Sequence, residues 1–339
     1  MHRRPGIRCQ HYRLGGRQKM NTAIGSDSTA LDLRVSIGSL VMQNPVGVAS
    51  GTFGYGEEYR ELVSIDRLGA LYTKAVTLEP REGNPPPRLV ETPMGLINSI
   101  GLANPGIERF LTEKLPLLKQ HRCAIVVNIA GSTEDDYVQV VERIEACAGP
   151  GQVPGSGVDA YEINVSCPNV HRGGMSFGTD PALVERLTRR LRNATRRPLI
   201  VKLSPNVTDI TEIARAAETG GADALSCINT VVGMVIDTER MRPAIARGTG
   251  GLSGPAIRPI GVAAVWKVSR AVAIPVIGLG GISTAEDALQ YLLAGAVAIQ
   301  VGTALFQNPS APLEILDGIA AWMQRHSVAR LDDIRHMME

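Results

Sequence analysis

The chain has 339 residues, of which 44% are hydrophobic and 20% are charged, and this composition excludes wholesale disorder. The formal net charge of +2 gives no reason to expect a nucleic-acid or membrane partner, and no apolar run approaches the roughly 18 residues of a membrane span. Aromatic residues make up only 4% of the chain, so the core must be built from aliphatic side chains.

The N-terminus differs in charge from the rest of the chain. Residues 1–19 carry six basic residues and no acidic one, whereas the remainder has 29 basic residues against 33 acidic ones. This leader lacks the apolar region of a secretory signal. We expect residues 1–30 to be a basic, disordered extension, or part of an over-long reading frame whose true start is Met20. A basic arm that docks onto a partner is the alternative.

The cysteines favour a cytoplasmic protein with reduced thiols. The five cysteines are scattered, no two form a CxxC pair, and histidine is scarce, so we expect no metal site built from this chain. We interpret Cys123 and Cys227 as small buried hydrophobes.

From residue 44 onward, short apolar runs alternate with helical patterns. The runs are almost continuously apolar, as expected of parallel strands covered on both faces. They span residues 46–50, 71–76, 124–129, 161–165, 199–203, 224–228, 275–278 and 297–301. Eight strands alternating with helices over about 250 residues predict an α/β fold, a (β/α)8 TIM barrel forming a single domain over 31–339. A doubly wound open sheet is the competing fold.

Local signals mark helix starts and loops. Asp180 before Pro181 predicts an N-cap, and Ser283 with Glu286 predicts a capping box. Segments 77–98 and 229–254 are long connections that follow strands, so we expect long active-site loops there. The Gly/Pro-rich segment 149–157 is predicted to be a surface loop.

Polar residues and glycines lie at the predicted strand ends, where barrel active sites form. Gly280-Gly281 and Gly302-Thr303 follow the last two strands and favour a phosphate-bearing ligand over simple turns. Lys74 and Lys202 lie within apolar strands, where a lysine either meets an anion or loses its proton for Schiff-base chemistry.

Amides and one thiol complete this set of residues. Four amides, Asn98, Asn128, Asn164 and Asn229, suit a planar ligand rich in C=O and N–H edges. Cys167, in a polar Ser-Cys-Pro-Asn turn, is the candidate general base.

These residues together resemble the dihydroorotate dehydrogenase family, FMN-containing barrels of pyrimidine biosynthesis. The resemblance runs from about Leu31 to the C-terminus, through blocks that occur in the family's order. They are ASGTFGYG (49–56), TKAV (73–76), NSIGLANPG (98–106), VNIAGS (127–132), EINVSCPNV (162–170), VKLSPN (201–206), INTVVGM (228–234), GGLSGPAIRP (250–259), GLGGI (278–282) and QVGTA (300–304).

The resemblance implies an activity and a set of site residues. Cys167 matches the catalytic base that removes the C5 proton of dihydroorotate while the C6 hydride passes to FMN, giving orotate. The positions that match the substrate pocket are Lys74, Asn98, Ser99, Ile100, Gly101, Leu102, Asn164, Asn229 and Thr230. The positions that match FMN contacts are Ser50, Lys74, Ala75, Asn128, Asn164, Lys202, Ile228, Gly254, Gly280, Gly281, Gly302 and Thr303. Lys202 would stabilise negative charge on the reduced flavin.

The resemblance also bears on the electron acceptor. Membrane-bound members have Ser at the position of Cys167, so Cys favours the soluble class. The following PNVHRGG resembles the NAD-linked branch, although His171 stands where that branch usually has Lys. This branch implies a homodimeric core in a heterotetramer of two catalytic chains and two partner chains that carry FAD and a 2Fe-2S cluster.

Other functions remain alternatives. They are a fumarate-linked homodimeric dihydroorotate dehydrogenase, a flavin-free lyase or isomerase that uses Lys74 or Lys202, and a non-catalytic barrel that binds a phosphorylated ligand. The pyrimidine-reducing dehydrogenases share similar blocks, usually within much longer chains.

Overall fold

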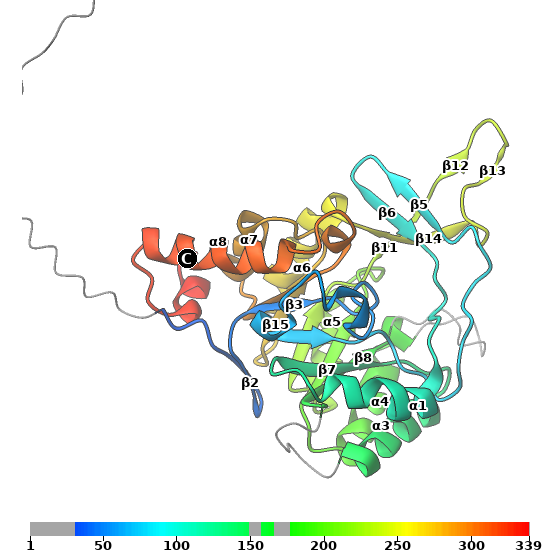
Figure 1. Ribbon diagram of the computed structural model, residues 1–339, viewed down its shortest axis with the longest axis horizontal. Coiled ribbons are helices and arrows are strands. Elements are labelled where there is room, and N and C mark those ends of the chain that lie inside the picture. The colour runs from blue at the N-terminus through cyan, green and yellow to red at the C-terminus, as the bar shows by residue number, and fades with distance from the viewer. Residues whose placement is uncertain (1–30, 149–156, 166–176, 339) are drawn as a thin grey trace, which may run out of the picture. The chain divides into compact units, whose positions relative to one another are not determined.

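Eight parallel strands close into a barrel in the computed structural model, which describes residues 31–148, 157–165 and 177–338 (Figure 1). In order around the barrel they are β3 (Val46–Val48), β4 (Ala70–Tyr72), β7 (Ala124–Ile129), β8 (Ala160–Asn164), β9 (Leu199–Leu203), β10 (Ala224–Cys227), β15 (Val276–Leu279) and β16 (Ala298–Val301). Since β16 pairs with β3, no edge strand is left open. The predicted (β/α)8 barrel is confirmed, and the open-sheet alternative is wrong.

The barrel strands are short because their sequence leaves nothing to expose. Every residue of β9 and β10 is buried, and β7 is buried from Ile125 onward. Strands covered on both faces tolerate continuous Val, Ile, Leu and Ala, which is the pattern of these segments. The predicted strand at 46–50 ends earlier, at Val48, where the chain leaves the sheet toward the barrel mouth.

Helices follow the strands and cover the outside of the barrel (Figure 1). They are α1 (Gly106–Arg109), α2 (Leu115–Leu118), α3 (Glu134–Ala148), α4 (Pro181–Ala194), α5 (Ile210–Thr219), α6 (Arg258–Val268), α7 (Ala285–Leu293) and α8 (Ala311–Arg325), with a π-helical stretch (Phe110–Lys114) between α1 and α2.

The helix caps confirm one sequence prediction and correct another. Asp180 caps α4 by accepting hydrogen bonds from the backbone N–H groups of Ala182 and Leu183, as predicted. The capping box of α7 is formed by Thr284 and Asp287, so the predicted pair one residue earlier is wrong. Both pairs have the required Ser/Thr and acidic residue at the same spacing, and only the helix register separates them.

The two long connections contain β-strands and are not wholly irregular loops. They contribute β5 (Leu89–Thr92), β6 (Gly95–Asn98), β11 (Val231–Met234) and β14 (Thr249–Ser253), which form an antiparallel sheet in the order β11-β14-β6-β5. A second pair, β12 (Ile236–Asp237) and β13 (Arg242–Pro243), extends from it beyond the barrel strands in Figure 1. The pairing of β14 with β6 joins both connections over the barrel.

The remaining strands are β1 (Val35–Ile37) and β2 (Leu40–Met42), which form an antiparallel hairpin that precedes the first barrel strand in the sequence. Residues 31–339 cluster as one compact unit. The predicted extension at 1–30, most of the predicted loop at 149–157 and the candidate base Cys167 lie outside the described residues. In the part that the structure describes, no helix combines the length and apolarity needed to cross a membrane.

Candidate active site

The carboxyl ends of the parallel strands bring most of the predicted residues to one mouth of the barrel. Ser50 follows β3, Lys74 and Ala75 follow β4, and Ile228 directly follows β10. Asn128, Asn164 and Lys202 lie in β7, β8 and β9, and Gly280 and Gly302 directly follow β15 and β16. Because all eight strands run the same way, these positions share one end of the barrel.

Lys202 connects the barrel interior to this mouth. Its side chain is almost fully buried, and its Nζ donates a hydrogen bond of 3.0 Å to Ser50 Oγ. The same Nζ lies 3.6 Å from Oε2 of Glu162, a residue of β8 that is completely buried. The predicted cofactor residues Ser50 and Lys202 are therefore in contact. Lys202 also pairs with Glu162, a carboxylate that the sequence analysis did not single out.

Glu162 is held by side chains from three further strands. Its Oε2 accepts a hydrogen bond of 2.6 Å from Asn128 Nδ2, and its Oε1 accepts from Ser226 Oγ at 2.9 Å and from Gln300 Nε2 at 2.8 Å. Burial alone would raise the pKa of Glu162, but the charge of Lys202 and the three hydrogen bonds outweigh it and lower the pKa. The carboxylate is therefore ionised at neutral pH.

Asn128 leaves one polar atom for a ligand. Its Nδ2 is bound to Glu162, whereas its Oδ1 is buried and has no hydrogen-bond partner among the described residues. Since buried carbonyl oxygens are almost always satisfied, this acceptor is a candidate partner for a ligand N–H.

Two of the predicted substrate amides meet at the ends of β8 and β10. Asn229 Nδ2 lies 3.4 Å from Asn164 Oδ1, and Asn229 Oδ1 accepts from the backbone N–H of Thr230 at 2.8 Å. Thr230 is anchored in turn, because its carbonyl oxygen accepts from Asn206 Nδ2 at 3.0 Å. The two amide planes are thus oriented by the protein itself.

The segment from Asn98 to Leu102 starts at the end of β6, in the sheet made by the long connections. Asn98 Nδ2 lies 3.3 Å from the carbonyl oxygen of Gly251 in β14, and Ser99 Oγ accepts from Asn84 Nδ2 at 2.8 Å. The chain turns sharply after Ile100, where Gly101 and Leu102 both have positive φ angles. The pairing of β6 with β14 therefore fixes the start of this segment relative to the loop that follows β10.

The predicted phosphate-binding residues lie at the ends of β15 and β16. They are Gly280, Gly281, Gly302 and Thr303, and Gly254, another predicted FMN contact, lies next to them after β14. Gly281 has φ +71°, and a Cβ there would lie 2.7 Å from the carbonyl oxygen of Gly254 and 3.0 Å from the backbone N of Arg258 at the start of α6. Thr303 Oγ1 donates to Ser253 Oγ at 2.8 Å. Close backbone approach beside a helix start is the arrangement that binds phosphate.

Lys74 lies in a different environment from Lys202. It is half-buried. Its pKa is lowered first by burial and then by the nearby charge of Arg88, while the charge of Glu58 opposes both effects. A lysine with this balance suits a site where an anionic ligand supplies the missing countercharge.

The sequence analysis missed Glu162, Ser226 and Gln300. All three lie in strands that read as apolar, and each is at most 1% exposed. The available signal was the acidic residue itself, because a carboxylate in a fully buried strand needs partners from neighbouring strands.

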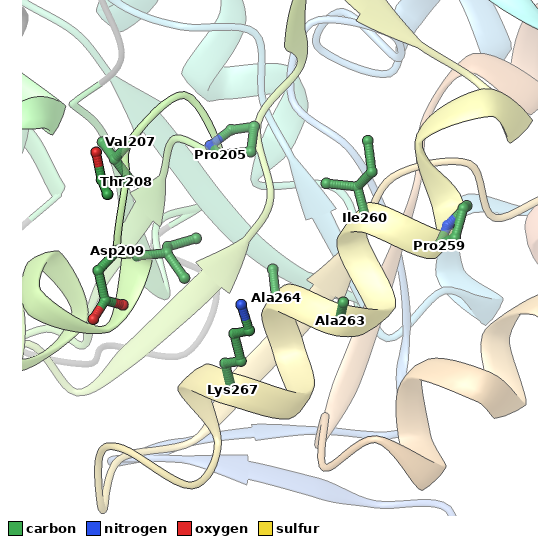
Figure 2. Close-up of a pocket in the computed structure, with 10 residues that line it drawn as sticks. Pro205, Val207, Thr208, Asp209, Pro259, Ile260, Ala263, Ala264 and Lys267 are labelled. Atoms are coloured by element: carbon green, nitrogen blue, oxygen red, sulfur yellow. The ribbon is translucent and has the colours of Figure 1, made fainter.

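A separate cavity of about 430 Å³ lies between the segment that begins at Pro205 and helix α6 (Figure 2). Figure 2 shows Lys267 of α6 reaching toward the segment that carries Asp209. None of the predicted site residues lines this cavity, so we assign it no part in the active site.

Comparison with known proteins agrees with this arrangement. The family model described as dihydroorotate dehydrogenase matches residues 32–323. Three curated relatives carry the name dihydroorotate dehydrogenase B (NAD(+)), catalytic subunit. The Pelobacter propionicus protein is 50% identical over 91% of this chain and 99% of its own length. The Trichlorobacter lovleyi protein is 50% identical over 91% of this chain and 98% of its own length. The Bacteroides fragilis protein is 48% identical over 91% of this chain and 99% of its own length.

A solved structure supports the fold independently. A dihydroorotate dehydrogenase from Eimeria tenella, crystallised with ferulenol, aligns with a TM-score of 0.73 and 24% identity, covering 90% of this chain and 89% of that one. The family model spans most of the chain, and the curated relatives align over nearly their full length. The chain therefore belongs to the dihydroorotate dehydrogenase family.

Proposed function

We propose that this chain is the catalytic subunit of an NAD-linked dihydroorotate dehydrogenase, which oxidises dihydroorotate to orotate in pyrimidine biosynthesis. The observation that carries the proposal is the 50% identity to relatives of that name over 91% of this chain. The cluster of lysines, amides and glycines at one barrel mouth supports it. The lysine-based lyase is disfavoured for Lys202, because its Nζ is held by the Glu162 carboxylate and by Ser50 Oγ inside the barrel.

The residues at the mouth fit FMN, the cofactor that the family implies. Asn128 Oδ1 offers a buried acceptor, Lys202 offers a positive charge, and the backbone around Gly281 leaves no room for a Cβ. We propose that Ser50, Asn128 and Lys202 hold the flavin ring and that the glycines hold its phosphate. FMN, when bound, supplies a two-electron acceptor for the substrate hydride.

The substrate would lie against the amides. We propose that Asn164 and Asn229, oriented by their mutual contact, bind the ring edges of dihydroorotate together with Asn98. Lys74 would supply the countercharge for its carboxylate. Cys167 Sγ stays the predicted base for the C5 proton, since it follows Asn164 by three residues at the end of β8 and a free thiol with a pKa near 8.5 can accept a proton near neutrality.

The relatives' names include the word subunit, and we propose that this chain also works with a partner. That partner would carry FAD and a 2Fe-2S cluster and pass electrons to NAD, in a heterotetramer of two catalytic and two electron-transfer chains in the cytoplasm. A fumarate-linked homodimer is the competing assembly.

The test is anaerobic addition of dihydroorotate to the purified chain reconstituted with FMN. We expect the flavin absorbance to bleach and neither NAD nor fumarate to restore it, because the partner is missing. Recovery with fumarate would favour the homodimeric enzyme, and failure to bind any FMN would refute the proposal.

Cys167 is tested in the same assay. Cys167→Ser should retain FMN and lose about 100-fold or more of the reduction rate at pH 7, since a serine hydroxyl is a far weaker base. Cys147→Ser, at an exposed cysteine, is the matched control. A normal reduction rate in Cys167→Ser would remove the base role.

A further inference from the structure

The centre of the barrel holds a charged group for which the proposed chemistry has no direct use. Glu162 is 0% exposed, and its carboxylate contacts Asn128, Lys202, Ser226 and Gln300, each from a different strand. Moving a carboxylate out of water costs several kcal/mol, so four converging partners indicate a place built for the anion.

Three of these partners are neutral and serve to fix the anion. Asn128, Ser226 and Gln300 donate hydrogen bonds of 2.6 to 2.9 Å, which hold both oxygens in position. The fourth partner is the ammonium of Lys202, at 3.6 Å. This distance is longer than a hydrogen bond but short for two opposite charges in a buried site. The carboxylate is therefore locked by the neutral donors and acts on Lys202 mainly through its charge.

The position of Lys202 depends on that charge. An ammonium buried without a countercharge tends to turn toward solvent. Among the described residues, Nζ has two polar partners, the Glu162 carboxylate at 3.6 Å and Ser50 Oγ at 3.0 Å. Only the contact with Ser50 is a hydrogen bond, so N–H donors of the ammonium remain for a ligand at the mouth.

We propose that Glu162 is a positioning residue, which holds the Lys202 ammonium in place beside the cofactor, so that the site favours reduced over oxidised flavin. This inference rests on the proposed function, because it assumes that FMN binds at this mouth. Glu162 is enclosed by side chains of four strands, and we infer that its charge acts on the cofactor mainly through Lys202.

The test is the flavin midpoint potential of Glu162→Gln, measured by equilibration with a reference dye. This variant keeps the shape of the side chain and removes its charge. We expect the affinity for reduced FMN relative to oxidised FMN to fall at least tenfold, which lowers the potential of this two-electron couple by about 30 mV. In a Lys202→Met background the same substitution should not lower the potential.

A matched control uses a second Lys–Glu ion pair among the described residues, whose side chains are partly buried. Lys114 Nζ lies 2.6 Å from Glu57 Oε2, outside the predicted cofactor residues, and Glu57→Gln should leave the potential unchanged. If Glu162→Gln fails to fold, Glu162→Asp replaces it in the test. The shorter side chain moves the carboxylate away from Lys202 by one methylene, so the flavin potential should fall by less than the roughly 30 mV expected for Glu162→Gln.

The outcomes separate this inference from the proposed function. A folded, FMN-loaded Glu162 variant with the wild-type potential would overturn the positioning role and leave the enzyme assignment intact. So would an equal fall of the potential in the Lys202→Met background. A wild-type chain that binds no FMN would overturn both.

Discussion

Gly281 gives the sharpest test of the predicted phosphate site. The residue has φ +71°, in the left-handed region, where alanine costs about 1–2 kcal/mol. Its Cβ would also lie 2.7 Å from the carbonyl oxygen of Gly254 and 3.0 Å from the backbone N of Arg258. Neither backbone atom can move without shifting the start of α6, so overpacking adds about 1–3 kcal/mol. Gly281→Ala should therefore destabilise the protein by about 2–5 kcal/mol.

Gly248 serves as a control that separates backbone strain from the steric clash of a Cβ. Gly248 has φ +81°, but a Cβ there would meet nothing closer than 4.0 Å, so Gly248→Ala has the same backbone strain without the clash. We expect this control to lose about 1–2 kcal/mol of stability and no FMN affinity. Gly281→Ala should in addition weaken FMN binding about tenfold or more, because each 1.4 kcal/mol lost at the phosphate is a factor of ten.

Two measurements on both variants separate the loss of stability from the loss of FMN affinity. Urea unfolding of the flavin-free chain gives the loss of stability, and a flavin fluorescence titration gives the dissociation constant of FMN. If Gly281→Ala bound FMN as tightly as Gly248→Ala while being less stable, the phosphate would not be held by this backbone.

Three further predictions concern buried charges and thiols. Arg197 is fully buried and paired with Glu145, so Arg197→Met should cost about 3–5 kcal/mol in urea unfolding by leaving that carboxylate without its charged partner and, among the described residues, with only the hydrogen bonds from Tyr161 and Thr195. The folded-state pKa of Glu162 is lowered, so its ionisation contributes stability above its ordinary pKa near 4.3, and this stability is lost as pH falls through the folded-state value. Acid titration below about pH 4.3 should therefore cost the wild type more stability than Glu162→Gln. Burial raises the pKa of Cys227, so iodoacetamide at pH 8 should label exposed Cys147 and spare Cys227 in the native chain, as peptide mass spectrometry would show.

The barrel could be predicted from sequence because its determinants are local. Each strand is a short apolar run, and each intervening helix has its own periodicity or cap, as at Asp180. The strand ends follow directly, so the positions of Ser50, Lys74 and Lys202 at one mouth were predictable before any contact was known. The capping box of α7 shows the limit of local signals, since two overlapping pairs satisfied the same rule.

The sheet beside the mouth could not be predicted in this way. Its central contact pairs Leu252 of β14 with Ile97 of β6, which are far apart in sequence. Strand pairing at such separation depends on register and on the barrel already being closed, and no short motif encodes either. The same holds for Glu162, whose four partners come from strands spread over most of the chain.

The polar centre of the barrel lowers the stability of the fold relative to an apolar filling. Barrels of this kind are usually filled with layers of Val, Ile and Leu, and such a filling would be at least as stable as a buried ion pair. Here one layer instead contains Glu162 and Lys202, with neutral donors whose contacts all serve the carboxylate. If the proposed FMN site is correct, this layer exchanges packing stability for a charge placed beside the cofactor. The charged pair then belongs to the barrel strands β8 and β9 and not to the connections at the mouth.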